Sequence, residues 1–368
     1  MKFTCTQENL SKGLTIAARF SDRNINLPIL NNVLLRAKKE GVIFTATNLE
    51  LAITTVVRGK IETPGEFTVA SRLLAEFVNS LKKEIITVSL EEKTLTITGE
   101  NHQTTLRGID ATDFPVIPTI DSKTAFTIPG DVLRHALSQV LFAAGTDESR
   151  PEITGVFLRV ENSTCTLAST DSYRLAQKKI AVKQAPKEDR EVIIPAKTLA
   201  EVVRIAEIEE PKEVSIAINE NQIKFTVGDT EITSRIIAGE YPDYKQIIPA
   251  SFKNEVAFAA NDMVRAIKTT SLFCKQGIND IRLSLEKRFT DIAVTAENST
   301  LGKNTSNVPS LSKQQEFDIV FNYKFFLDGL QHLMGEQAVL KTNDPASPAL
   351  LSSPSEKDFL YIIMPIRQ

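Results

Sequence analysis

One pattern of secondary-structure signals occurs twice in the chain, at positions more than one hundred residues apart. Residues 191–249 begin with a short apolar run, continue with apolar residues at helical spacing, and then alternate as strands do. Residues 66–118 follow the same order, and Leu74-Ala75-Glu76 matches Leu199-Ala200-Glu201. A chain that repeats itself at this distance is a repeat protein at the level of whole domains.

Extending the pattern divides the 368 residues into three blocks, 1–121, 122–249 and 250–368. Each block is expected to run strand, helix and three strands, and then the same order again. Many short strands with two helices per block predict the α+β class, with two helices packed on antiparallel sheets in each repeated domain. Repeats that join edge to edge either coil openly or close into a ring.

Composition excludes several classes of protein. No run approaches the ~18 apolar residues of a membrane-spanning helix, and the first ten residues lack the apolar core of a signal peptide. Cys5, Cys165 and Cys274 lie far apart, which suits a reducing cytoplasm and gives no metal-binding spacing. A net charge of −3 argues against a wholly basic nucleic-acid coat but allows one basic face. We therefore expect a cytoplasmic protein without a membrane segment.

No motif for catalysis, a metal or a cofactor is present. The chain has no Gly-x-Gly-x-x-Gly, no Walker A sequence and no His-Glu-x-x-His, and its three histidines occupy unrelated positions. An enzyme that uses scattered acids such as Asp171 and Asp243 is the alternative. The repeat counts against it, because Asn48 and Asn298 stand at the positions equivalent to Asp171. We expect a non-catalytic protein without metal or cofactor.

Basic residues recur on the predicted helices, outside the apolar stripe. Lys and Arg solvate any exposed helix face, but Arg72 and Lys197 precede the shared Leu-Ala-Glu at similar positions. A basic helix face in a protein of net negative charge suits contacts with phosphates. The residues predicted to make such contacts are Arg72, Arg134, Lys197, Arg204, Arg265 and Lys268.

The C-terminal end is unusually apolar for a chain terminus. It reads Tyr361-Ile362-Ile363-Met364-Pro365-Ile366-Arg367. A last core strand accounts for the first three of these residues but less well for the next three. An apolar cleft beside a chain end, with a flexible methionine in it, is a suitable site for docking a peptide.

These residues together resemble the bacterial DNA polymerase III beta subunit, or sliding clamp, over the whole chain. The matching motifs are Met1-Lys2-Phe3-Thr4, Leu27-Pro28-Ile29-Leu30, Thr170-Asp171, Arg174-Leu175, Tyr241-Pro242-Asp243-Tyr244 and the C-terminal end. The resemblance implies clamp N-terminal, central and C-terminal domains at the three blocks, and a head-to-tail homodimer that closes a ring around double-stranded DNA. It implies no catalysis and no sequence-specific reading of the DNA.

The resemblance also implies partners and sites. The partners would be the clamp loader, the replicative polymerase alpha subunit, translesion polymerases and repair proteins, all bound through a short linear motif. The matching partner-site residues are Arg150, Ile153, Thr170, Ser172, Tyr173, Arg174, Leu175, Pro242, Gln246, Ile247, Asn322, Ala346, Pro348, Ile362, Met364, Pro365, Ile366 and Arg367. Arg23 would contact DNA, and the subunit interface would pair Thr104 and Leu106 with Leu272 and Phe273. The remaining alternative is an open repeat scaffold that binds peptides without encircling DNA.

Overall fold

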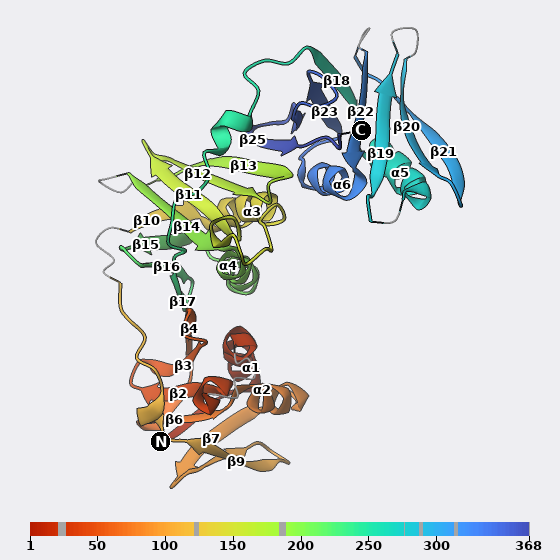
Figure 1. Ribbon diagram of the computed structural model, residues 1–368. Helices are drawn as coiled ribbons and strands as arrows, with labels where there is room; N and C mark the ends of the chain where they lie inside the picture. The colour runs from red at the N-terminus through yellow and green to blue at the C-terminus, as the bar shows by residue number, and fades with distance from the viewer. Residues whose placement is uncertain are drawn as a thin grey trace. The chain divides into compact units, whose positions relative to one another are not determined.

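The computed structural model describes residues 1–20, 27–120, 125–183, 189–275, 277–286, 290–312 and 316–367. These residues form helices and antiparallel sheets (Figure 1). The helices are α1 (Gln7–Ala17), α2 (Ser71–Ser80), α3 (Gly130–Leu141), α4 (Ala196–Glu209), α5 (Ala260–Thr270) and α6 (Tyr323–His332). Each predicted block therefore carries two helices, and every strand pair is antiparallel, which confirms the predicted α+β class.

The chain forms two compact units, which are described separately. The first contains Met1–Asp131 and Glu201–Ile236, and the second contains Val132–Ala200 and Ile237–Gln368. These units do not follow the predicted blocks, because strands of neighbouring blocks pair with each other in one sheet. The block limits 1–121, 122–249 and 250–368 stay a prediction.

One sheet of 13 strands runs through the first unit, in the order β10-β15-β16-β17-β4-β3-β2-β6-β9-β8-β7-β1-β5. Its strands from the N-terminal part are β1 (Lys2–Thr6), β2 (Asn32–Lys38), β3 (Gly41–Thr47), β4 (Leu51–Val57), β5 (Lys60–Thr63), β6 (Gly65–Ala70), β7 (Ile85–Glu91), β8 (Thr94–Thr98) and β9 (Gln103–Ile109). Its other strands are β10 (Phe126–Pro129), β15 (Glu213–Ile218), β16 (Gln222–Val227) and β17 (Thr230–Arg235).

The second unit holds two sheets. One has the order β14-β11-β12-β13-β25-β24-β23-β18 and the other β21-β20-β19-β22. The strands of the larger sheet are β11 (Gly155–Glu161), β12 (Thr164–Thr170), β13 (Arg174–Ala181), β14 (Arg190–Pro195), β18 (Asn254–Ala259), β23 (Gln337–Thr342), β24 (Ala349–Ser353) and β25 (Glu356–Ile363). Those of the smaller sheet are β19 (Asp280–Leu285), β20 (Asp291–Asn298), β21 (Gly302–Pro309) and β22 (Phe317–Asn322).

The helices form because their apolar residues recur at helical spacing and meet a sheet. In α1, Leu10 and Leu14 are fully buried, and the side chain of Thr6 caps the first turn by accepting from the backbone N–H of Asn9 at 3.3 Å. α1 packs against α2 and β4, and α5 packs against β20 and β21. These two helices thus pack an apolar face against strands of their own unit.

Two strand pairs join neighbouring blocks inside the units. β17 of the second block pairs with β4 of the first, with Ile232 opposite Ile53. β25 of the third block pairs with β13 of the second, with Tyr361 opposite Ala176. In both pairs the last strand of one block joins the fourth strand of the block before it. The fourth strands are β4 in the first block and β13 in the second. The blocks are therefore held together by the same backbone hydrogen bonds that build each sheet.

Some strands were not individually identified from the sequence, and β21 and β5 are the most polar examples. β21 is mostly polar, and most of its residues are at least partly exposed. β5 is a short strand whose four residues are exposed or half-buried. Polar edge strands bury few apolar residues, so the alternation that reveals other strands is weak in them.

Gly329 in α6 gives a test of this packing. A Cβ atom there would collide with the ring of Tyr361, which is fully buried on β25. Alanine normally stabilises a helix interior by about 1 kcal/mol relative to glycine. Here we expect Gly329→Ala to lower the free energy of unfolding by about 1–3 kcal/mol, because the clash outweighs the helix preference.

Urea unfolding measures this change. Lys324→Ala, at an exposed position of the same helix, is the control and should stay within about 0.5 kcal/mol of the original protein. A Gly329→Ala variant as stable as the control would show that α6 and β25 do not pack as closely as described.

Candidate functional site

A tight turn precedes β13 and presents two side chains to solvent. The Thr170 hydroxyl donates to the carbonyl of Arg174 at 2.6 Å, and Asp171 Oδ1 accepts from the backbone N–H groups of Tyr173 and Arg174. Ser172 is held at a φ of 78°, in the left-handed region that non-glycine residues rarely adopt. Strained backbone of this kind often marks functional sites. The turn leaves Tyr173 64% exposed.

The C-terminal tail lies against this turn. Ile362 is opposite Leu175 in the β13–β25 pair, and the chain then leaves the strand. The N–H of Met364 donates to the carbonyl of Tyr173 at 2.9 Å, and the N–H of Ile366 donates to the carbonyl of Val320 at 2.8 Å. These two bonds hold the tail in place, so the side chains of Met364 and Ile366 remain half-buried at the surface.

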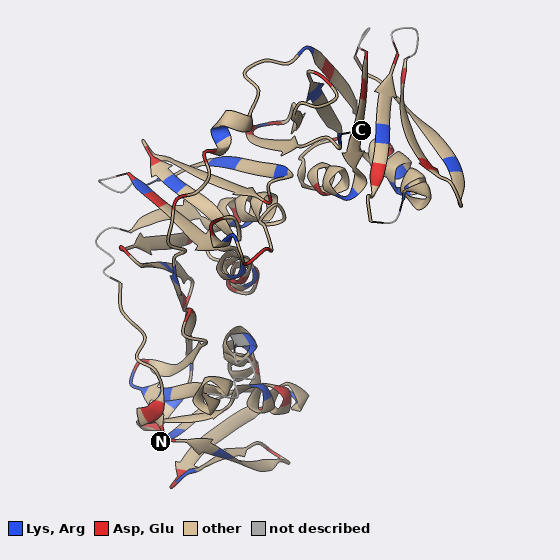
Figure 2. Cartoon of the chain, viewed as in Figure 1, with Lys and Arg blue, Asp and Glu red and all other residues tan. Residues whose placement is uncertain are grey.

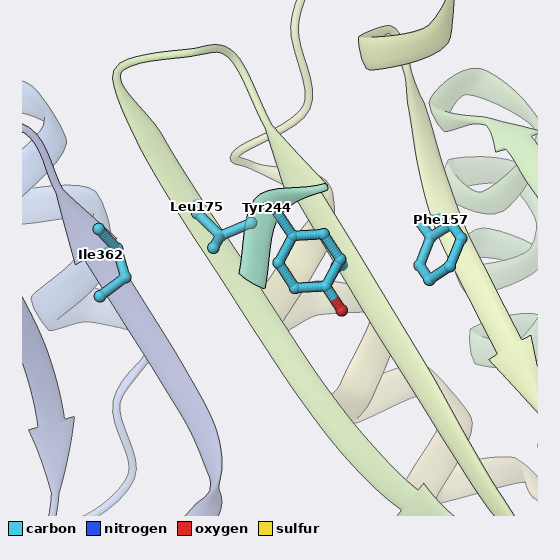
Figure 3. Packing of buried hydrophobic residues seen from close by; sticks show 5 residues of the cluster. Phe157, Leu175, Tyr244 and Ile362 are labelled. Atoms are coloured by element: carbon cyan, nitrogen blue, oxygen red, sulfur yellow. The ribbon is translucent and has the colours of Figure 1, made fainter. Parts of the chain in front are cut away.

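An apolar cluster lies beneath the turn and the tail (Figure 3). It consists of Phe157, Ala168, Leu175, Tyr244 and Ile362, of which Leu175 and Ile362 are fully buried. The Tyr244 hydroxyl donates to Gln177 Oε1 at 3.0 Å, so this buried phenol has a partner. Tyr241 packs against the cluster, with its ring centroid 5.2 Å from that of Phe157.

Arg174 is clamped beside this cluster. Its guanidinium lies 4.5 Å from the ring centroid of Phe325 and 5.5 Å from that of Phe142. It also forms ion pairs with Asp171, at 2.9 Å, and with Asp328. The ring of Tyr173 stacks on Phe325, with 6.4 Å between centroids. We call the stacked rings of Tyr173 and Phe325, with Arg174 against Phe325, the aromatic wall; it lies next to the apolar tail.

Three buried phenols near this site, those of Tyr241, Tyr244 and Tyr361, are neutral at physiological pH. Burial raises the pKa of Tyr244 to about 12, and it raises the pKa values of Tyr241 and Tyr361 well above their usual range. For Tyr361 the nearby Arg174 works against this rise. The site therefore offers apolar surface and hydrogen bonds at neutral pH.

All predicted partner-site residues lie in the second unit, at different depths. The exposed ones are Arg150, Ser172, Tyr173, Gln246, Ile247, Ala346 and Arg367. The half-buried ones are Arg174, Pro242, Asn322, Pro348, Met364, Pro365 and Ile366. Ile153, Thr170, Leu175 and Ile362 are buried and form the base beneath the others. Arg150 Nη1 donates to Ser172 Oγ at 2.8 Å, which ties one rim residue to the strained turn.

The sequence did not identify three residues of this site. Phe142, Phe325 and Asp328 surround Arg174, but each looks like an ordinary helical or loop residue in the sequence. The available signal was the Phe325-Phe326 pair, because adjacent helical positions point about 100° apart, so two large rings there face different surroundings. Phe326 is fully buried, which leaves Phe325 to contact Arg174.

The predicted DNA-contacting residues divide into three groups. Arg72, Arg134, Lys197, Arg265 and Lys268 are exposed on α2, α3, α4 and α5. Both signs of charge occur on these helices (Figure 2), and Arg72 pairs with Glu76 at 3.0 Å. Arg23 lies outside the described residues. Arg204 forms the third group, because its side chain bonds to carbonyl groups of α1.

The prediction for Arg204 is corrected by its contacts. Its guanidinium pairs with Glu201 and donates to the carbonyls of Thr15, at 3.2 Å, and Ile16, at 3.0 Å. These carbonyls belong to the last turn of α1, where a helix leaves its acceptors without partners. Arg204 is only 16% exposed and fastens α4 to the end of α1.

One predicted interface residue is also corrected. Leu106 is 8% exposed and lies opposite Leu95, a fully buried residue, so its side chain faces the core of the first unit. Thr104 is half-buried on the same strand. Leu272 is 72% exposed and Phe273 is half-buried in a short 3-10 helix, η7 (Ser271–Phe273), that contacts β21.

Within the described residues there is no group of three or more His, Cys, Asp or Glu side chains placed to hold a metal ion. In that same part of the chain, none of the helices has the length and apolarity needed to cross a membrane.

The fold and the site are those of a protein that binds other macromolecules, and comparison with known proteins specifies the family. The models of the DNA polymerase III beta subunit match the N-terminal domain at residues 1–118, the central domain at 127–243 and the C-terminal domain at 245–367. The beta sliding clamp of Synechococcus elongatus is 30% identical over 372 residues, covering 100% of this chain and 99% of the relative. The chain belongs to the DNA polymerase III beta subunit family.

Solved structures agree with this assignment. The DNA polymerase sliding clamp of Bacillus subtilis has a TM-score of 0.94 at 27% identity, covering 100% of this chain and 99% of that one. A Pseudomonas aeruginosa sliding clamp bound to griselimycin has a TM-score of 0.94 at 28% identity, covering 100% of both chains. The predicted fold class and the predicted family are thus confirmed.

The cysteines give a test of how tightly both units are packed. Burial raises the pKa values of Cys5 and Cys165 to about 12, and burial together with Asp280 raises that of Cys274 to about 11. Because the thiolate is the reactive form, we expect no thiol of the native protein to react rapidly with a disulfide reagent at pH 8. In concentrated urea all three should react. A rapidly reacting native thiol would contradict the burial described here.

Proposed function

We propose that this chain is the subunit of a DNA sliding clamp that acts in the bacterial cytoplasm. Two copies form a ring around duplex DNA, and the ring tethers the replicative polymerase to its template without catalysing a reaction. Family membership supports this proposal, and so does the rule by which the blocks join. That rule, in which the last strand of one block pairs with the fourth strand of the block before it, is the observation from which we infer ring closure.

After the two internal junctions are made, one last strand of a block (β9) and one fourth strand of a block (β21) have no partner of the other kind among the described strands. β9 is the last strand of the first block and pairs with β6 only through Gly108 and Ile109, so residues 103–107 have an open edge. β21 is the edge strand of its sheet and is the equivalent of β4 and β13. Open edges invite pairing with another chain. Joining β9 of one copy to β21 of the next repeats the internal rule between chains.

The internal junctions also fix the register of this third junction. Ile109 and Ile237 occupy equivalent positions opposite Thr68 and Ile193, which aligns Thr104 with Ile232. Ile232 lies opposite Ile53, and the equivalent of Ile53 on β21 is Asn304. Thr104 of one copy would therefore lie opposite Asn304 of the other. The contact is head to tail, and two such contacts close a dimer.

Exposed Leu272 fits this interface. It lies in the 3-10 helix beside β21, so a neighbouring chain paired with β21 would cover it together with Phe273. Thr104 would pair through its backbone, and Leu106 would support β9 from the core side. The proposed interface residues are thus Thr104, Leu272 and Phe273, with Leu106 behind them.

For DNA contact we propose the exposed helix residues Arg72, Arg134, Lys197, Arg265 and Lys268. Their charges suit phosphates, which look alike along any duplex, so binding would be independent of sequence and sensitive to salt. Contacts of this kind let a ring move along DNA. Sliding requires no residue that reads a base edge.

For partners we propose the clamp loader, the polymerase alpha subunit, translesion polymerases and repair proteins. Each would dock a short segment with apolar and aromatic residues between Tyr173, the tail at Met364 and the wall made by Phe325. Flexible Met364 lets one site accept several sequences. A tethered polymerase then works at a high effective concentration near the primer end.

The proposal is tested by retention on DNA. Protein loaded onto nicked circular DNA should remain bound when the salt concentration is raised, because a closed ring is held topologically. Cutting the circle should release it within the time needed to slide off the ends. Equal loss from circular and linear DNA would favour the alternative, an open scaffold that binds peptides.

The interface is tested by Leu272→Asp. Burying an unpaired carboxylate between chains costs several kcal/mol, so the variant should sediment as a monomer at micromolar concentration. Met334→Asp is the matched control, because Met334 is 47% exposed but lies just after α6, outside β21 and η7. A Leu272→Asp variant that stays dimeric would contradict the proposed interface.

The partner site is tested by removing residues 364–368. This deletion takes away the tail that donates to Tyr173 and Val320, so affinity for the polymerase alpha subunit should fall by at least tenfold. The dimer should persist, because the tail bonds to Tyr173 and to Val320 on β22, at the edge of the four-stranded sheet opposite β21. Surface plasmon resonance measures the affinity, and unchanged binding would contradict the site.

A further inference from the structure

The turn that begins the partner site has a close copy in the first unit. In residues 47–51 the Thr47 hydroxyl donates to the carbonyl of Leu51 at 2.9 Å, as Thr170 does to Arg174. Asn48 Oδ1 accepts from the N–H groups of Glu50, at 3.1 Å, and Leu51, at 2.8 Å, as Asp171 does in the other turn.

The strained residue is copied as well. Leu49 has a φ of 76°, close to the 78° of Ser172, and its N–H donates to Thr47 Oγ1 at 3.0 Å. Leucine has no glycine-like freedom at this angle, and its side chain is 47% exposed. The fold thus holds an apolar side chain at the surface at a conformational cost, which indicates a use for it.

The strand beside the turn, β17 here and β25 at the partner site, has the same pairing and the same backbone hydrogen bond at both places. Thr233 lies opposite Ala52, as Ile362 lies opposite Leu175. The N–H of Arg235 donates to the carbonyl of Glu50 at 2.9 Å, which matches the bond from Met364 to Tyr173. The β4–β17 junction therefore reproduces the backbone of the β13–β25 junction on which the partner site is built.

A cavity of about 230 Å³ opens at this copied junction. Its apolar lining comes from Leu49, Ala52, Pro115, Val116, Ile117 and Pro118. Val116 is 92% exposed, an unusual exposure for a branched apolar side chain held between two prolines. A hollow of 720 Å³ adjoins it through Gln222 and Arg235 and is lined by the polar turn of residues 219–222.

We propose that this cavity is a second docking site, which takes one aliphatic side chain of an extended peptide segment from a partner protein. The volume is below the range of about 300–1,000 Å³ found for small-molecule sites, and it suits a single leucine-sized anchor. The adjoining polar hollow accommodates the polar residues that flank such an anchor. Every residue of the site belongs to the first unit.

The side chains around the two sites differ and set different preferences. Glu50 stands where the first site has Tyr173, Leu49 where it has Ser172, and Thr233 where it has Ile362. The second site therefore lacks the aromatic wall and selects an aliphatic anchor rather than an aromatic one. The mode of binding is taken from the proposed partner site, so the test measures the two sites separately.

Disulfide tethering tests the proposal. The native thiols are buried, so Gln222→Cys places one reactive thiol at the mouth of the cavity. The probe is the symmetric disulfide of the peptide acetyl-Cys-Gly-Leu-Ser-amide, which exchanges with the protein thiol and releases one peptide thiol. It is compared with the disulfides of the peptides that carry alanine or aspartate in place of leucine. At equilibrium with a reductant we expect the leucine peptide to be captured about tenfold more than the alanine peptide.

A second substitution identifies the cavity as the cause. Val116→Asp on the Gln222→Cys background should abolish the preference for leucine, whereas Ile85→Asp, at a position 67% exposed on β7, should leave it unchanged. Equal capture of the leucine and alanine peptides, no capture, or a preference that survives Val116→Asp would each overturn the proposal.

The same peptides tethered through Gln246→Cys report on the first site. Selectivity at Gln246 without selectivity at Gln222 overturns the second site and leaves the proposed function intact. Selectivity at Gln222 alone supports the second site and counts against the first. Loss of selectivity at both positions overturns both.

Discussion

Antiparallel pairing between the last strand of one block and the fourth strand of the block before it is the interaction on which this structure depends. It occurs as β17 with β4 and as β25 with β13. Backbone hydrogen bonds carry it, so its geometry is insensitive to the side chains of the blocks. This explains how three blocks of different sequence are joined in one way, and it is the reason why we propose the same pairing between two chains.

Each junction does more than hold blocks together. The turn before the receiving strand is forced into a left-handed conformation at Ser172 and at Leu49, and the departing strand then bonds back to that turn. At the β4–β17 junction a cavity of about 230 Å³ opens beside the turn. In our proposals the side chains decide what each junction binds: Tyr173, Phe325 and Met364 at one, and Leu49 and Val116 at the other.

Much of this architecture could be predicted from the sequence. The repeat, the helical spacing and the alternation in strands are strong local signals, and they yielded the fold class, and together with the matching motifs the family. Three kinds of feature were beyond such signals. β21 is an edge strand that buries few apolar residues, Leu106 turns inward because it faces Leu95, and the Arg204 guanidinium bonds to carbonyl groups of α1. Each depends on residues distant in sequence, so no local pattern could reveal it.

The central claim is that the junction between chains repeats the junction within them. A disulfide between Thr104→Cys and Asn304→Cys tests it most directly, because residues opposite each other in an antiparallel pair are within disulfide reach. The account predicts that the double variant oxidises to a covalent dimer on non-reducing gels and, when loaded on nicked circular DNA, stays linked to it after denaturation. A double variant that remains monomeric under oxidising conditions, or that cross-links no better than Thr104→Cys with Lys324→Cys, would contradict it.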